Sequence, residues 1–133
     1  MRKFLLDTNL LLRFLTSDDP KKAKAVANLL KTSKDPLIVT DLAFAELAWV
    51  MASFYDFDKE QIINKLASIL NFKKIRSNKK LLRKSLSIYA AHNIDFIDAY
   101  HAAYASLKSF DVIYSYDKDF DKVKGVKRIE PSK

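Results

Sequence analysis

The stretch Phe4-Leu5-Leu6-Asp7 constrains the fold most, because three apolar residues in a row are followed at once by a carboxylate. A strand covered on both faces in a parallel α/β sheet has such a continuous apolar run. Ligands of open α/β sheets bind just beyond the carboxyl ends of the strands, so Asp7 is a candidate site residue. The alternative, that Asp7 is the N-cap of a helix over Leu10–Leu15, is equally compatible with the sequence.

The following segments predict more of the same α/β architecture. Asp18-Asp19-Pro20 opens a helix through about Leu30, and Pro36–Val39 is a second short apolar strand that ends at Thr40-Asp41. A helix between two such strands is a βαβ unit, whose strands lie parallel. We therefore expect one α/β domain spanning residues 1–133.

The segment Leu42–Tyr55 is apolar all round and carries one charge, Glu46. Such a helix is buried on most sides or covered by a partner. A buried carboxylate needs a partner, which makes Glu46 a second candidate; the alternative is a side chain that reaches solvent. Helices are also expected from Lys59 to about Leu70 and, after a Ser77-Asn78 cap, through about Ala91.

Two further acids follow in the last third of the chain. Asp95 has the position of an N-cap with Asp98 in the first turn, and the alanines after Asp98 form a small-residue face that directs Asp98 toward the sheet edge. Asp117 follows the short strand Asp111–Tyr114 as Asp7 follows the first strand. A last strand is expected over Lys127–Ile129.

Convergence of Asp7, Glu46, Asp98 and Asp117 would require a cation. Two unit charges ~4 Å apart repel by ~4 kcal/mol at an effective dielectric constant near ~20. All-oxygen ligation favours Mg²⁺ or Mn²⁺ over zinc or copper. We therefore predict that these four acids are both the metal ligands and the catalytic residues.

The net charge of +8 is unevenly distributed, since no acid lies between Glu60 and Asp95. This interval suits a phosphate backbone, although a solvated helix face gives the same pattern. The candidate substrate-binding residues are Lys73, Lys74, Arg76, Lys79, Lys80, Arg83 and Lys84.

Composition excludes several other classes. Gly125 is the one glycine, so the glycine-rich nucleotide-binding loops and the hydrolase elbow are absent. The chain has no cysteine, which removes disulfides and thiolate chemistry and fits the cytoplasm. No uncharged run is long enough for a membrane span, so no membrane association is expected.

Four motifs together resemble the PIN-domain nucleases and, within them, the VapC-type toxins of toxin–antitoxin pairs. They occur in the family's order and at its approximate spacing over nearly the whole chain. The motifs are Leu6–Asn9, Ala45–Val50, Asp95–Ala99 and Ser115–Phe120.

The resemblance implies a three-layer fold, with a mostly parallel sheet of strand order 3-2-1-4-5 between helices. It also implies an acidic pocket from the four acids named above and metal-dependent cleavage of RNA. Asn9 and Ser115 are implied as orienting groups, and Asp95 and Asp119 as accessory acids beside the pocket. One departure from the family is Ala45, where many relatives have a small hydroxyl residue.

The apolar helix also predicts protein partners, because its aromatic residues exceed what one face of a small sheet can bury. The expected interaction groove comprises Trp49, Met51, Phe54, Tyr55 and Phe57. By resemblance, an antitoxin segment covers it and inserts an arginine toward Asp7 or Asp117. Self-association as a homodimer is also expected.

Other functions remain open. A housekeeping PIN nuclease in RNA processing has the same residues, and a non-catalytic Mg²⁺-binding or RNA-binding α/β module needs the acids to be structural. A receiver module requires adjacent acids after the first strand, where this chain has Asp7 alone. A D-x-D phosphatase requires an aspartate at the position of Asn9.

Overall fold

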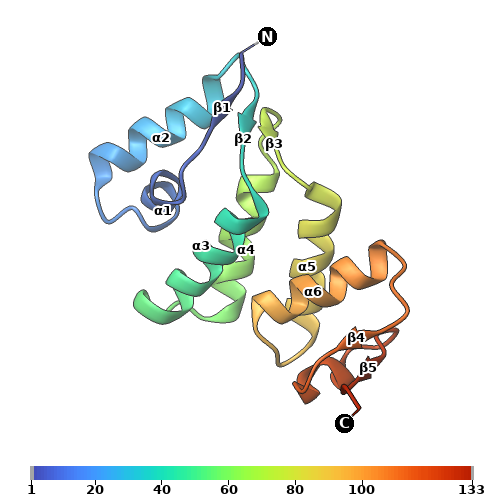
Figure 1. Ribbon diagram of the computed structural model, residues 1–133. Coiled ribbons are helices and arrows are strands. Elements are labelled where there is room, and N and C mark those ends of the chain that lie inside the picture. The colour runs from blue at the N-terminus through green and yellow to red at the C-terminus, as the bar shows by residue number, and fades with distance from the viewer. Residues whose placement is uncertain (1, 133) are drawn as a thin grey trace. The chain divides into compact units, whose positions relative to one another are not determined.

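A computed structural model describes residues 2–132, which form two compact units that divide after Lys79. Each unit is an assembly of helices and short parallel strands (Figure 1). Within residues 2–132, no helix combines the length and apolar character needed to cross a bilayer.

The first unit contains a three-stranded parallel sheet of order β1-β2-β3, built from β1 (Phe4–Leu5), β2 (Leu37–Ile38) and β3 (Ile75–Arg76). Figure 1 shows these strands side by side. The register pairs Leu5 with Ile38 and Ile38 with Arg76. Backbone hydrogen bonds continue past the strand ends, from the Leu6 N–H to the Ile38 carbonyl at 2.9 Å and from Val39 to Arg76 at 3.0 Å.

The helices of this unit begin at capping residues that the sequence supplies. They are α1 (Thr8–Thr16), α2 (Pro20–Thr32), α3 (Asp41–Phe54) and α4 (Lys59–Leu70). Asp19 caps α2, Thr40 caps α3, and Asp58 and Gln61 form a reciprocal capping box at α4. Helix α4 thus has the predicted bounds.

The second unit contains α5 (Lys79–Ala91, of which Lys79 belongs to the first unit), α6 (Phe96–Leu107) and the 3₁₀ helix η1 (Lys118–Lys122). Its strands β4 (Ile113–Tyr114) and β5 (Arg128–Ile129) are parallel neighbours. The α/β fold class is as predicted. Both observed strand orders are parts of the predicted 3-2-1-4-5 order, and its join between β1 and β4 stays a prediction, as does a single domain.

Three expectations about burial and capping were wrong. Phe4 and Leu5 are 39% and 71% exposed, so this strand is not covered on both faces. Met51 is fully buried on α3 and so cannot belong to an exposed groove. Ser77 does not cap α5 with its side chain, since its Oγ makes no hydrogen bond among residues 2–132, and the Asn78 amide nitrogen donates to Asp41.

Helix α3 divides into a buried side and an exposed apolar side. Phe44 is fully buried, whereas Phe54 on the same helix is 70% exposed and contacts the Trp49 ring edge at a centroid distance of 5.4 Å. Truncating Phe44 removes core contacts, whereas truncating Phe54 mainly alters the surface.

We predict that Phe44→Ala lowers the free energy of unfolding by ~3–5 kcal/mol, because a buried ring leaves a cavity. Phe54→Ala is the matched control and should cost under ~1 kcal/mol, since it loses mainly one aromatic contact. Urea denaturation followed by circular dichroism measures both. Equal losses in the two variants would contradict the assigned orientation of α3.

Candidate active site

Three carboxylates meet in the second unit. Asp98 lies in the first turn of α6, Asp117 lies three residues after the end of β4 as the N-cap of η1, and Asp119 lies within η1. Each offers an oxygen that is within 4.8 Å of the other two. The carboxyl end of β4 and the start of α6 therefore bring two of the four predicted acids together, and Asp119, predicted as an accessory acid, completes the cluster.

Local hydrogen bonds shape the turn that carries Asp117 and Asp119. The Ser115 Oγ accepts from the Asp117 N–H at 2.9 Å, and the Asp117 Oδ1 accepts from the Asp119 N–H at 2.9 Å. These bonds close two consecutive tight turns, so the side chains of Asp117 and Asp119 start from one compact segment of backbone. Ser115 therefore orients the turn that carries the acids.

Two cations support this turn from outside. The Lys122 Nζ lies 2.9 Å from the Asp119 Oδ1 and also donates to the Asn93 carbonyl at 3.1 Å. Arg128 donates to the Ser115 carbonyl at 2.9 Å and to both carboxylate oxygens of Asp121, and its side chain is 11% exposed. The hydrogen bonds from Arg128 lower the pKa of Asp121 and keep it ionised. Arg128 thus links β5 to the end of β4 and to η1.

The electrostatics of Asp98 differ from those of an ordinary surface acid. Its partial burial raises the pKa of Asp98, and the nearby charges of Asp117, Asp95 and Asp119 raise that pKa further. Asp95 occupies the N-cap position of α6, as expected, but its side chain makes no capping hydrogen bond. The cluster therefore favours a bound cation or a proton.

The remaining predicted acids lie in the first unit and are described by themselves. Asp7 follows β1, is exposed, and caps α1 by accepting from the Asn9 N–H at 3.3 Å, so both interpretations of its sequence position remain compatible. Glu46 lies on α3 and is exposed, so the expectation that it is a buried charge in need of a partner was wrong. Convergence of Asp7 and Glu46 with the cluster stays a prediction.

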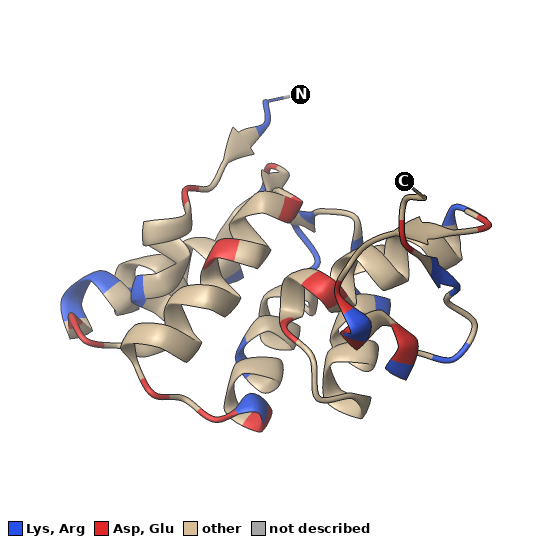
Figure 2. Cartoon of the chain, turned by 60° about the horizontal axis from the view of Figure 1, so that its bottom comes forward, with Lys and Arg blue, Asp and Glu red and all other residues tan. Residues whose placement is uncertain are grey.

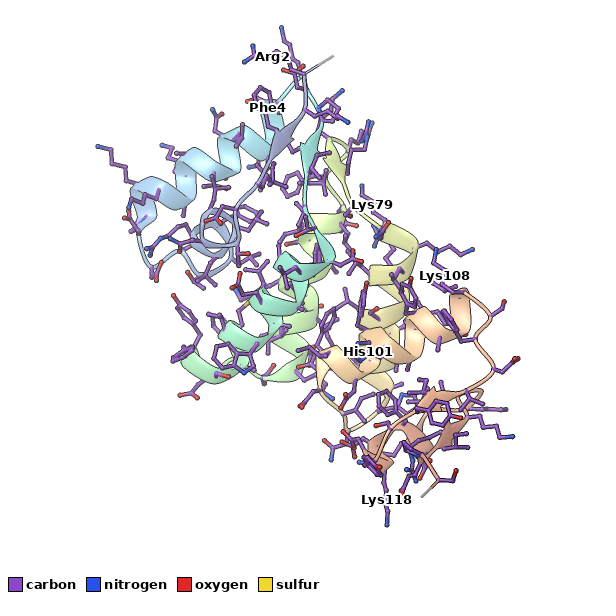
Figure 3. The ribbon with its side chains drawn as sticks, viewed as in Figure 1. Arg2, Phe4, Lys79, His101, Lys108 and Lys118 are labelled. Carbon is purple, nitrogen blue, oxygen red and sulfur yellow. The ribbon has the colours of Figure 1, made fainter. Side chains whose placement is uncertain are left out.

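The basic residues occupy the turn before β3, β3 itself and the first half of α5, and Figure 2 colours such residues blue. Lys73, Arg76, Lys80 and Arg83 are exposed, and Lys74, Lys79 and Lys84 are partly buried. Arg76 donates to the Lys73 carbonyl at 2.7 Å, and Lys79, which Figure 3 labels at the start of α5, donates to the Phe72 carbonyl at 3.1 Å. Two of the seven are therefore also tied to the turn before β3.

One feature was missed by the sequence reasoning. A pocket in the first unit is lined by residues 38–42 and 76–78, at the carboxyl ends of β2 and β3. Part of the signal was present, because Thr40-Asp41 follows a short apolar strand as Asp7 does, whereas the strand before Ser77-Asn78 contains Arg76.

Comparison with known proteins gives the class. The family model of the PIN domain matches residues 4–126, so the chain belongs to the PIN domain family, whose members are nucleases. No curated protein matches the chain. Among solved structures, a similar chain comes from the crystal structure of VapBC2 from Rickettsia felis bound to a DNA fragment from their promoter. It is 15% identical, with a TM-score of 0.42 over 97% of this chain and 98% of that chain.

The burial of Asp98 and the charges of its neighbours predict that neutralising this side chain stabilises the folded state. Because the pKa of Asp98 is raised in the folded state, ionised Asp98 destabilises that state. This destabilisation is absent at pH values where Asp98 is protonated in both the folded and the unfolded state. It is complete once the pH exceeds the pKa of Asp98 in the folded state. In buffer that contains EDTA, Asp98→Asn should therefore raise the melting temperature at pH 7.5 and change it little at pH 3.5.

Thermal unfolding monitored by circular dichroism at both pH values measures this difference. Asp111→Asn is the matched control, because Asp111 is exposed and lies outside the cluster. A lower melting temperature for Asp98→Asn at pH 7.5 would mean that the ionised carboxylate is a net stabilising group.

Proposed function

We propose that the chain is a metal-dependent ribonuclease that hydrolyses RNA phosphodiester bonds. The observation that carries the proposal is the cluster of Asp98, Asp117 and Asp119 in a chain of the PIN family. The three carboxylates supply the hard oxygen donors that Mg²⁺ or Mn²⁺ prefers. Burial and then the neighbouring carboxylates raise the pKa of Asp98, and such an ion would relieve the repulsion among these carboxylates. The donor set of the cluster thus fits the ion that the family implies.

Asp98, Asp117 and Asp119 would hold the ion, together with Asp7 and Glu46 by resemblance to the family. When bound, the ion supplies Lewis acidity to a water and to the scissile phosphate. Ser115 and Arg128 fix the backbone of the acidic turn, which limits the reorganisation needed on binding. Lys122 neutralises part of the charge on Asp119.

The proposed cleavage should require Mg²⁺ or Mn²⁺ and stop in EDTA. Asp98→Asn and Asp117→Asn should each lower kcat/KM on single-stranded RNA by at least ~100-fold, because each removes a ligand charge at the reacting centre. Asp111→Asn, which changes the same charge outside the cluster, should keep full activity. Gel-resolved cleavage of a labelled oligoribonucleotide measures these rates, and cleavage that persists in EDTA would contradict the proposal.

We also propose that the basic stretch holds substrate phosphates. Replacing Lys80, Arg83 and Lys73 together by glutamine should flatten the dependence of log Kd on log salt by ~0.7 for each lost single-strand phosphate contact. Fluorescence anisotropy with a labelled RNA strand in EDTA gives the slope. The control is Lys21→Gln/Lys24→Gln/Lys31→Gln on α2, because these lysines are exposed and lie outside the stretch. A slope unchanged in the first variant assigns the stretch to an ordinary solvated face.

The role that we infer for the ribonuclease is the toxin of a toxin–antitoxin pair, which also forms a homodimer. Its support is the family resemblance and the apolar surface of α3, where Trp49 is 56% and Phe54 70% exposed. Tyr55 stacks on Phe57 at a centroid distance of 5.7 Å beyond the end of the helix. An amphipathic partner helix would cover this surface in the way that helix-in-groove complexes do.

Expression should separate a toxin from a housekeeping nuclease. The chain alone should arrest growth, and co-expression with a neighbouring small gene should restore growth and give a co-purifying complex. Asp98→Asn is the control that should be harmless alone, because it lacks a catalytic acid but keeps the surface of α3. Harmless expression of an active, monomeric wild-type protein would favour the housekeeping role.

A further inference from the structure

Two aromatic rings form an exposed stack at the end of α6, in the second unit. Tyr104 lies on α6 and Phe110 follows the helix; the angle between their ring planes is 20°, and their centroids are 5.9 Å apart. Tyr104 is 39% and Phe110 59% exposed. We call this pair the aromatic platform, because it presents a flat apolar surface to solvent.

The turn after α6 places Phe110 against Tyr104. Ser109 has a φ of 60°, in the left-handed region, and its N–H donates to the Ser106 carbonyl at 3.3 Å. The Phe110 N–H donates to the Ala105 carbonyl at 2.9 Å, which completes a Schellman motif. An apolar contact such as that of Phe110 with Tyr104 often accompanies this motif, so packing explains the parts of the two rings that meet. It does not explain the large exposed fraction of the Phe110 ring.

A cation without an acidic partner lies beside the platform. The Lys108 Nζ is 6.0 Å from the centroid of the Tyr104 ring, at the outer limit of a cation–π contact. Lys108 is exposed and makes no ion pair with any acid of residues 2–132. A nucleotide combines a planar base with a phosphate charge, so it matches both features. A second apolar protein surface matches them less well, because it would bury the lysine without a counter-charge.

One face of α6 connects the platform with the acidic cluster. Asp98, His101, Tyr104 and Lys108 follow one another at spacings of three, three and four residues, so each lies next to the preceding one on the helix surface. His101 is exposed, and Figure 3 labels it on α6 with Lys108 at the end of the helix. The rise of ~1.5 Å per residue puts the backbone of Tyr104 ~9 Å beyond that of Asp98 along α6. A strand of ~4 nucleotides, the lower end of single-strand site sizes, spans this distance.

We propose that the aromatic platform is a stacking subsite for one nucleobase of a single-stranded RNA segment whose backbone reaches the acidic cluster. This inference rests on the proposed function, because the ligand is part of the proposed substrate. The base stacks on the exposed side of Phe110, and Lys108 pairs with the adjoining phosphate. Every base has a π-face, so the subsite strengthens binding without selecting a sequence. A base inside a duplex is already stacked, so the subsite favours single-stranded RNA.

Two substitutions at one position separate stacking from packing. Phe110→Leu keeps an apolar side chain for the contact with Tyr104 but removes the flat ring. It should weaken binding of a fluorescein-labelled adenylate hexamer at least ~5-fold, as expected for the loss of one base–aromatic stack. Phe110→Tyr is the matched control and should bind as the wild type does, because it keeps the ring. Anisotropy of the full chain in EDTA, where metal-dependent cleavage is blocked, gives each Kd.

A second ligand isolates the contribution of the base. A hexamer with the same ribose–phosphate chain but no bases cannot stack, so wild type and Phe110→Leu should bind it equally. Lys108→Gln should instead flatten the dependence of log Kd on log salt by ~0.7 for both hexamers, because it removes one phosphate contact.

Tryptophan fluorescence reports the stack directly. Trp49 is the one tryptophan of the chain, so Phe110→Trp/Trp49→Phe carries a single indole, at the platform. Saturating adenylate hexamer should quench its emission, whereas the hexamer without bases should not.

An unchanged Kd of Phe110→Leu for the adenylate hexamer, or an equal loss of affinity for both hexamers, would overturn the subsite. If Phe110→Leu leaves that Kd unchanged but converts a dimeric wild type into monomers in light scattering, the platform is an interface between copies of the chain. If the protein cleaves RNA and Phe110→Leu binds it normally, only this inference fails. If the protein neither binds nor cleaves RNA, the proposed function fails and the subsite fails with it.

Discussion

Repulsion among carboxylates is the constraint on which the functional part of this protein depends. Asp98, Asp117 and Asp119 offer oxygens within 4.8 Å of one another, and the pKa of Asp98 is raised as a result of burial and of these neighbouring charges. Such an arrangement persists only if the surrounding chain holds it. Ser115, Lys122 and Arg128 do so through hydrogen bonds and ion pairs to the turn that carries Asp117 and Asp119. The local fold of the second unit therefore holds three carboxylates close together, which favours positive charge at this place.

The first unit contributes a different chemistry at the carboxyl edge of its sheet. Asp7, Thr40-Asp41 and Ser77-Asn78 follow three parallel strands in register, so polar groups from distant parts of the sequence become neighbours. The pocket beside Asp41 and the position of the candidate ligand Asp7 both result from this single feature of a parallel sheet.

Much of this organisation can be predicted from the sequence, because it depends on local sequence signals. The capping box of Asp58 and Gln61 marks the start of α4, and acids that directly follow apolar runs mark the strand ends. The predictions that were wrong concern features that depend on tertiary packing. The exposure of Phe4 and Leu5, the exposure of Glu46 and the burial of Met51 are set by which side of an element meets its neighbours, and an apolar helix gives no periodicity from which to infer that side. The closeness of Asp119 to Asp98 depends on the tight η1 turn, and the pocket beside Asp41 depends on strand register. Local patterns therefore indicate some of these polar residues but not which of them lie together.

The central claim is that Asp98, Asp117 and Asp119 bind a divalent cation, and electron paramagnetic resonance of Mn²⁺ tests it most directly. Titration of the metal-free chain with Mn²⁺ should reduce the free-ion signal in a saturable way, and excess Mg²⁺ should restore that signal. Asp117→Asn should weaken this binding at least ~10-fold because a ligand charge is lost, whereas Asp111→Asn should bind as the wild type does. Saturable binding that is unchanged in Asp117→Asn would contradict the account, since the ion would then be held elsewhere, and so would the absence of saturable binding in the wild type.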